Sequence, residues 1–178
     1  YIMFGKNTYE VKLYKQFLQT FPGNKVELIS RSENGNKWIL YVSSDISPGT
    51  YYLFDKATNN LQFLFRNLDS IPIELMSESQ PVTFAASDDV LIHGFLTLPV
   101  SVPKDKDAPL VVLVHGGPHG VRDYWTFDRD VQYLASQGYA VLRVNYRGSG
   151  GYGSDYRYSG YQEWGNRIQL DIIEGAQW

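Results

Sequence analysis

Short apolar segments alternate with turn residues through most of the first half of the chain. Four segments rich in Val, Ile, Leu, Tyr, Phe and Trp are KVELISR (25–31), KWILYVS (37–43), TYYLFD (50–55) and LQFLF (61–65). The breaks between them contain Asn, Gly, Pro or Asp, which tolerate the backbone dihedrals of turns. This pattern predicts an antiparallel meander of about 40 residues, the size of one β-propeller blade. Because one blade cannot bury both of its faces, we expect sibling blades upstream.

The segments on either side of the predicted meander have other patterns. Val11, Tyr14 and Leu18 recur at helical spacing, which predicts a helix over residues 10–21. Residues 66–80 show weak periodicity and are typical of a connector. We therefore predict two domains. Residues 1–78 would be the end of a β-propeller with its connector, the last blade spanning about 25–65, and residues 79–178 would form a second domain.

The second domain begins with strands. Segments on both sides of Asp88 and Asp89 predict a β-hairpin, PVTFAAS followed by VLIHGFLTLP. Two later apolar runs, APLVVLVHG (108–116) and YAVLRVN (139–145), are typical of strands covered on both faces. We expect YAVLRVN, and also APLVVLVHG, to lack a neighbouring strand on one side, because the predicted sheet is incomplete.

Helices are predicted between and after these two strands. The first has one apolar face and a stop at Gly138; that face comprises Phe127, Val131, Leu134 and Ala135. The second, over residues 166–178, has a capping box of Asn166 and Gln169 and a stripe of Ile168, Ile172 and Ala176. Strands alternating with helices predict an α/β sheet with parallel crossovers.

Composition and charge exclude several classes of protein. The 43% hydrophobic content is that of a globular chain, and a net charge of −3 offers no electrostatic footprint for nucleic acid. With no cysteine, the chain has no disulfides, thiolate metal sites or cysteine nucleophiles. No apolar run approaches the roughly 18 residues that a membrane span needs. The start, YIMFGKNTYE, has neither an initiator Met nor a signal pattern, so we expect an internal start. We expect a cytoplasmic protein, with a periplasmic or secreted one as the alternative.

The most informative motif is His115-Gly116-Gly117-Pro118, directly after an apolar run. Two glycines let the backbone turn sharply and approach a ligand, since no Cβ blocks it. Ligands of α/β sheets lie at the carboxyl ends of the strands. A backbone N–H there can donate to an oxygen that becomes negative in a transition state, as in an oxyanion hole. In esterases and lipases an HGG-type turn supplies one such donor, and the residue after a serine nucleophile supplies another.

The three histidines can also be interpreted as structural residues. His115 could be a metal ligand or a general base, but His93 is distant from it in the sequence and no H-E-x-x-H motif is present. We therefore expect no metal site and favour a His115 that packs and hydrogen-bonds to hold the turn. His93 lies in the middle of a strand and is expected to be structural. The glycine-rich RGSGGYG resembles a phosphate-binding loop only superficially, because it lacks the G-x-x-x-x-G-K-[ST] pattern of a P-loop, so we expect no nucleotide.

A serine nucleophile in its usual setting is missing. Such serines occur as G-x-S-x-G at a strand-to-helix turn. Three serines follow the HGGP motif in or near the glycine-rich segment, but none has glycine two residues before it; they are Ser149, Ser154 and Ser159. We therefore expect the Ser-Asp-His triad to lie beyond residue 178. The 178-residue chain alone would then be an inactive fragment.

Several motifs together resemble the prolyl oligopeptidase family of serine peptidases, in its acylaminoacyl-peptidase and dipeptidyl-peptidase-like branch. VVLVHGGPHGVRDYW, QGYAVLRVNYRGSGGYG and EWGNRIQLDIIEGAQW resemble the start of its catalytic domain. PVTFAASDDVLIHGFLTLP resembles the entry into that domain, although a DG turn is usual where DD stands here. GTYYLFDKATNNLQFLF resembles the last propeller blade. The resemblance runs from about residue 21 to residue 178.

The resemblance implies an α/β protein in which a β-propeller caps an α/β-hydrolase domain. It implies cleavage of short peptides by acyl transfer through a serine, without a cofactor. By position, Gly117 would donate its N–H to the oxyanion, with His115, Gly116 and Pro118 shaping the turn. The tyrosines and Arg147 of residues 145–153 are expected to pack and order a loop.

Other functions and partners remain open at this point. A fragment of an esterase or lipase of the same fold would share the HGG motif, and a non-catalytic propeller-type binding module is a second alternative. The expected partners are short peptides and the rest of the same chain, with no nucleic acid and no membrane. Self-association into a homo-oligomer is left open.

Overall fold

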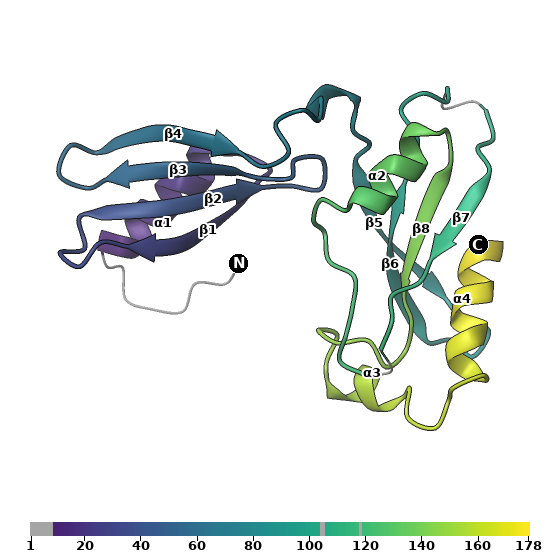
Figure 1. The fold of residues 1–178 in the computed structure, drawn as a ribbon. Coiled ribbons are helices and arrows are strands. Elements are labelled where there is room, and N and C mark those ends of the chain that lie inside the picture. Colours follow the sequence, from purple (N-terminus) through teal and green to yellow (C-terminus); the bar gives the residue numbers. More distant parts are fainter. Residues whose placement is uncertain (1–8, 104–105, 118) are drawn as a thin grey trace. The chain divides into compact units, whose positions relative to one another are not determined.

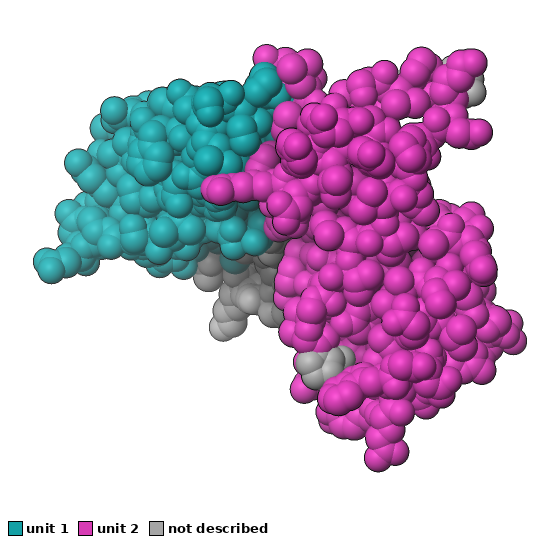
Figure 2. Space-filling view, turned by 45° about the vertical axis from the view of Figure 1, so that its right-hand side comes forward, with its two compact units in different colours: residues 1–73 teal, residues 74–178 magenta. Residues whose placement is uncertain are grey.

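The computed structural model describes residues 9–103, 106–117 and 119–178. The chain divides into two compact units, Tyr1–Ile73 and Glu74–Trp178, which are coloured separately in Figure 2. Within the described residues, no helix is long and apolar enough to cross a membrane. The assignment of residues 1–78 to a propeller stays a prediction.

The first unit is one helix and a four-stranded antiparallel meander (Figure 1). Its strands pair in chain order, as the sequence predicted. Its elements are α1 (Tyr9–Thr20), β1 (Lys25–Arg31), β2 (Lys37–Ser43), β3 (Thr50–Asp55) and β4 (Asn60–Arg66). The bounds of β1 to β3 agree with the sequence prediction, because turn-forming residues flank each strand.

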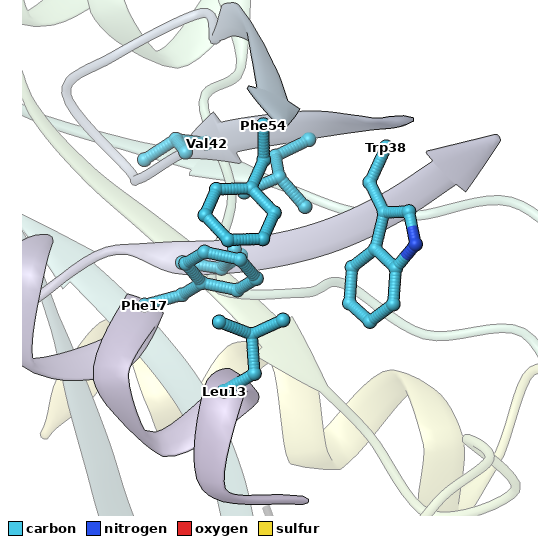
Figure 3. Packing of buried hydrophobic residues seen from close by; sticks show 7 residues of the cluster. Leu13, Phe17, Trp38, Val42 and Phe54 are labelled. Atoms are coloured by element: carbon cyan, nitrogen blue, oxygen red, sulfur yellow. The ribbon is translucent and has the colours of Figure 1, made fainter. Parts of the chain in front are cut away.

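Helix α1 packs its apolar side against the meander (Figure 3). Leu13 and Phe17 point toward Phe54 and Trp38, and all four side chains are buried. The ring of Phe17 meets that of Phe54 edge-on, with centroids 4.9 Å apart. This aromatic contact fixes the helix on the sheet.

The buried stripe of α1 differs from the predicted one. The sequence pattern placed Val11, Tyr14 and Leu18 on the inner face, whereas Leu13 and Phe17 are the helix residues that the structure buries. Tyr14 and Leu18 lie at the margin of the cluster and are partly buried. An aromatic ring at the centre of the contact removes more apolar area from water than Val11 would, which favours the observed rotation.

The second unit contains a mixed four-stranded sheet in the order β5-β6-β8-β7. The predicted hairpin is present and antiparallel, β6 pairs antiparallel with β8, and β7 pairs parallel with β8. The strands are β5 (Ser79–Ala85), β6 (Leu91–Thr97), β7 (Leu110–Leu113) and β8 (Ala140–Asn145). A short 3-10 helix, η1 (Ile73–Leu75), precedes them.

Two expectations about these strands were wrong. All residues of β8 are buried and the strand has partners on both sides, so it is not an edge strand. Strand β7 is the edge of the described sheet, as expected for APLVVLVHG, but it is short and only partly buried rather than covered on both faces. Its apolar composition alone does not distinguish a central strand from an edge strand.

Helix α2 (Arg129–Ser136) connects β7 to β8 and gives the predicted parallel crossover. The Asp128 carboxylate caps it by accepting from the N–H groups of Asp130 and Val131. Its carboxyl end turns at Gly138, whose φ of 89° lies in the left-handed region that glycine tolerates. The predicted stop at Gly138 is confirmed.

Helix α4 (Arg167–Gln177) follows the one-turn helix α3 (Ser154–Tyr158), which the sequence pattern did not predict. Its buried residues are Ile168, Asp171 and Gly175. Of the predicted stripe, Ile168 is buried and Ile172 is partly buried against the core, whereas Ala176 is exposed. The predicted capping box does not form: the Asn166 side chain accepts no hydrogen bond from the first turn, and its Nδ2 donates to the carboxylate of Glu163. Asp171 is buried because its carboxylate pairs with the guanidinium of Arg147.

Candidate active site

The HGG turn (residues 115–117) follows β7 at the carboxyl edge of the sheet. Gly117 has a φ of 81°, a conformation that side chains with a Cβ rarely adopt. The Tyr146 hydroxyl shares its one proton between the carbonyl oxygens of Gly117, at 2.8 Å, and His115, at 3.1 Å. The rings of His115 and Tyr146 stack with centroids 4.4 Å apart. Tyr146, the first residue after β8, thus holds the turn at two points.

The imidazole of His115 is engaged on both ring nitrogens. Its Nε2 lies 2.9 Å from Ser149 Oγ, and its Nδ1 lies 3.1 Å from the carbonyl oxygen of Gly116. Ser149 is almost fully buried, so this serine–histidine pair does not face a substrate. The contacts of His115 are those of a residue that orders the turn. Pro118, the last residue of the predicted motif, lies outside the described residues.

The backbone of the HGG turn is open to an incoming group. Gly116 and Gly117 are both exposed. Within the described part of the chain, the Gly117 N–H donates to no backbone oxygen. A hydrogen-bond donor is therefore available where α/β sheets bind their ligands.

A second segment, the glycine-rich loop (residues 146–153), runs beside the chain that leaves the HGG turn. Gly120 donates its N–H to the Gly148 carbonyl at 3.0 Å, and Gly150 donates to the Val121 carbonyl at 3.0 Å. A Cβ on Gly150 would collide with the backbone of Gly120, so this close approach requires glycine. The two segments form one hydrogen-bonded structure.

Asn145, at the end of β8, links the segment that follows the HGG turn to the glycine-rich loop. Its Oδ1 accepts from the Asp123 N–H at 2.7 Å, and its Nδ2 donates to the Asp123 carbonyl at 3.2 Å and to the Tyr152 hydroxyl at 2.9 Å. Burial raises the pKa of the Asp123 carboxyl, partly offset by nearby Arg143. A fully buried asparagine with every polar group used positions both loops.

Arg147 joins three separate segments of the unit. Its guanidinium donates to both oxygens of Asp171, at 2.7 to 3.1 Å, and to both oxygens of Asp88, at 2.8 and 2.9 Å. The hydrogen bonds from Arg147 hold the pKa of Asp88 at about 2, and the two carboxylates raise the pKa of Arg147. The expectation that Arg147 orders the loop agrees with these contacts.

The other two histidines make aromatic contacts. His93 stacks on Tyr152 with centroids 4.4 Å apart, and burial lowers its pKa. His119 lies against Tyr161, with centroids 4.2 Å apart. Over the described ranges, no group of three or more His, Cys, Asp or Glu side chains could hold a metal ion.

Comparison with known proteins identifies the family. Residues 125–178 match the profile of the Prolyl oligopeptidase family. Over 163 residues the chain is 36% identical to the dipeptidyl aminopeptidase BIII of Pseudoxanthomonas mexicana; the match covers 88% of this chain and 23% of that protein. The chain belongs to the prolyl oligopeptidase family.

Other members of the prolyl oligopeptidase family support this assignment. The chain is 53% identical to the acylamino-acid-releasing enzyme of Arabidopsis thaliana over 47 residues, which cover 26% of this chain and 6% of that enzyme. The structure of a Mycobacterium tuberculosis puromycin-hydrolyzing peptidase matches with a TM-score of 0.68 and 29% identity, over 80% of this chain and 23% of that one. The acylaminoacyl peptidase of Pyrococcus horikoshii matches with a TM-score of 0.65 and 26% identity, over 86% and 24%.

The mixed α/β fold agrees with those of the prolyl oligopeptidase family structures. These curated relatives match the chain over most of its length. The chain itself spans about a quarter of the length of each relative. The prolyl oligopeptidase family is a family of serine peptidases.

Several residues of the site were not singled out from the sequence. Asn145 ends a predicted strand and Tyr146 follows it, so their place at the carboxyl edge of the sheet could have been inferred, but the contact of Tyr146 with the HGG turn depends on the β7–β8 register. The partners of Arg147 could not, because Asp88 and Asp171 are 59 and 24 residues away along the chain. A charged residue inside an otherwise apolar helical stripe, as at Asp171, was the available signal.

Proposed function

We propose that this chain forms part of a serine peptidase, in which the HGG turn supplies one donor of the oxyanion hole. The observation that carries the proposal is the exposed Gly117, whose N–H donates to no backbone oxygen of the described residues, on a turn that Tyr146 and His115 contact. One such donor is worth about 3 to 4 kcal/mol of transition-state stabilisation. The substrates would be short peptides, cleaved by acyl transfer without a cofactor.

The nucleophile of this reaction would come from residues that are not in this chain. The 178 residues contain no G-x-S-x-G, and Ser149 is buried against His115. An oxyanion donor without a nucleophile has nothing to acylate. We infer that the 178-residue chain alone is inactive, that the triad lies in sequence beyond residue 178, and that residues 25–65 are the last blade of a propeller.

A serine-reactive fluorophosphonate tests where the nucleophile lies. Intact mass of the treated 178-residue chain should show no adduct. A longer protein that contains this chain and a downstream G-x-S-x-G should gain one adduct, which is lost when that serine is replaced by alanine. A stoichiometric adduct on the 178-residue chain would overturn the assignment.

The reaction class is tested on the same longer protein with three chromogenic substrates. Dipeptidyl and N-acyl-aminoacyl p-nitroanilides report peptidase activity, and a p-nitrophenyl ester reports esterase activity. We expect hydrolysis of at least one anilide. Hydrolysis of the ester alone would favour the esterase alternative, and the absence of all three activities would favour a binding module.

A further inference from the structure

A cavity of about 450 Å³ lies where the glycine-rich loop meets helix α3. Four glycines line it, together with Ser154, Arg157 and Tyr158. Glycines leave backbone atoms and open space at the wall, so the side chains that give the cavity its chemistry are the two hydroxyl groups and the guanidinium. We call it the Arg157 cavity.

Arg157 is an exposed cation that lacks a counter-ion. In the described parts of the chain its guanidinium makes no ion pair and no hydrogen bond, unlike the fully paired Arg147. A guanidinium carries five N–H donors in a planar fork and keeps its charge at every physiological pH. Such a group on a cavity wall favours a planar anion that accepts two hydrogen bonds.

The surrounding residues leave room for the guanidinium and add a second positive charge. An ideal Cβ on Gly120 would lie 3.5 Å from Cζ of Arg157, an ordinary contact distance, so the guanidinium lies directly beside this glycine. The Arg122 guanidinium packs against Gly151 and over the ring of Tyr124, at 4.4 Å from its centroid. Among the described residues that line the cavity none is acidic, although the hydroxyl of Ser154 donates to the exposed Asp155 carboxylate at 3.4 Å.

The Arg157 cavity is connected to the HGG turn through a short chain of contacts. An ideal Cβ on Gly117 would lie 2.8 Å from Cγ2 of Val121. The Val121 carbonyl accepts the N–H of Gly150, which lines the cavity. A peptide whose carbonyl lies at Gly117 therefore has a cationic cavity close to it on the same loops.

We propose that the Arg157 cavity binds a carboxylate of the peptide substrate, and that Arg157 is a specificity-determining residue. This inference rests on the proposed function, because it assumes a peptide bound at the HGG turn. The carboxylate can come from an acidic side chain or from the carboxyl terminus of the peptide. Both present the same planar anion to the guanidinium.

Three matched probes separate these sources without requiring catalysis. N-acetyl-glutamate α-amide carries only the side-chain carboxylate, N-acetyl-glutamine only the terminal one, and N-acetyl-glutamine amide neither. Each is titrated into the ¹⁵N-labelled 178-residue chain, and the amide signals of Gly120 and Gly150 and the Nε–H signal of Arg157 are followed by NMR. We expect at least one carboxylate to bind about tenfold more tightly than the neutral amide.

Variants test whether Arg157 causes the preference for a carboxylate. Arg157→Gln should remove the difference between the charged and neutral probes, and Arg157→Lys should retain part of it. Arg129→Gln is the matched control, because Arg129 is an exposed arginine on α2, at the opposite end of the unit from α3 in Figure 1. It should leave the difference unchanged.

Two outcomes would overturn the proposal. One is equal binding of all three probes, and the other is a carboxylate preference that survives Arg157→Gln. Because binding is measured on the chain itself, failure of the proposed peptidase activity in the longer protein would leave this result interpretable. If that protein does cleave peptides, Arg157→Gln should raise KM for the preferred acidic peptide about tenfold. The KM for the neutral analogue of that peptide should stay unchanged.

Discussion

At the residue scale, the hydroxyl of Tyr146 is the side-chain group that contacts the candidate site most directly. It donates to two carbonyl oxygens of the HGG turn, while its ring stacks on His115. Both the conformation of the turn and the direction of the Gly117 N–H therefore depend on this side chain. Burial raises the pKa of Tyr146, so the hydroxyl stays a donor at neutral pH.

Replacing Tyr146 with phenylalanine removes these two hydrogen bonds and keeps the ring. We expect the free energy of unfolding of the second unit to fall by about 1 kcal/mol, because water can reach the freed carbonyl of Gly117. In the longer peptidase we expect kcat to fall while KM hardly changes, since the oxyanion contact is made in the transition state. Urea denaturation and steady-state kinetics measure both effects. Tyr133→Phe, at an exposed tyrosine on α2, should change neither.

Asp171 is the residue whose replacement should cost the most stability. Its buried carboxylate accepts from the side chain and the backbone N–H of Arg147. Asp171→Asn leaves part of a buried guanidinium without its charge partner, and we expect a loss of about 3 kcal/mol. Urea denaturation followed by tryptophan fluorescence measures it, since Trp178 stacks on Phe84 at the end of α4. A loss no larger than that of the exposed Asp155→Asn would contradict this role.

At the scale of elements, helix α2 depends on its first turn. Asp128 caps it through two backbone N–H groups, at 2.9 and 3.0 Å. Asp128→Ala should cost about 1 kcal/mol, whereas Asp128→Asn should retain most of the stability because an amide oxygen also accepts. Hydrogen exchange of the α2 amides, compared between the two variants, gives the measurement. Equal exchange in both would show that the cap contributes little.

The sequence predicted elements well where side-chain chemistry acts locally. The bounds of β1 to β3, the hairpin of β5 and β6, and the stop at Gly138 follow from turn residues beside apolar runs. The central position of β8 and the burial of Asp171 depend on partners distant in sequence, so periodicity could not reveal them. The turn α3 was missed because its glycine- and tyrosine-rich segment has no apolar period, while its Tyr156 is fixed by a hydrogen bond to the Asn145 carbonyl.

The HGG motif of the candidate site could be predicted from the sequence, but the residues that hold the turn in place could not. The HGG turn was located from His115 and two glycines that follow an apolar run, and the structure describes it at the end of β7. Its supports, Tyr146 and Ser149, come from a second strand–loop segment. Which of the many tyrosines and serines of the chain would meet the turn depends on the β7–β8 register, which the sequence does not specify.

At the scale of the whole molecule, Arg147 explains how the second unit becomes one structure. Its guanidinium ties the β5–β6 hairpin turn, the glycine-rich loop and α4 together through Asp88 and Asp171. A second arginine, Arg167, lies 3.6 Å from the same Asp88 carboxylate. Loss of charge at Asp88 should therefore loosen contacts between segments that are far apart in sequence.

Acid provides the test of this linkage. The pKa of Asp88 is about 2 in the folded chain and 3.8 for the free side chain, so its charge stabilises the fold above about pH 4 and ceases to do so as the pH falls toward 2. At pH 7, Asp88→Asn should lower the free energy of unfolding by about 1 kcal/mol, less than the pKa shift alone implies because Asp88 is partly exposed. The difference between wild type and variant should shrink as the pH falls through 2. Asp89→Asn, at the neighbouring position of the turn, has no such partner in the described structure and should follow the wild type at every pH. Urea denaturation between pH 2 and 7 measures all three proteins, and a difference for Asp88→Asn that persists unchanged at pH 2 would show that its charge is not what stabilises the junction.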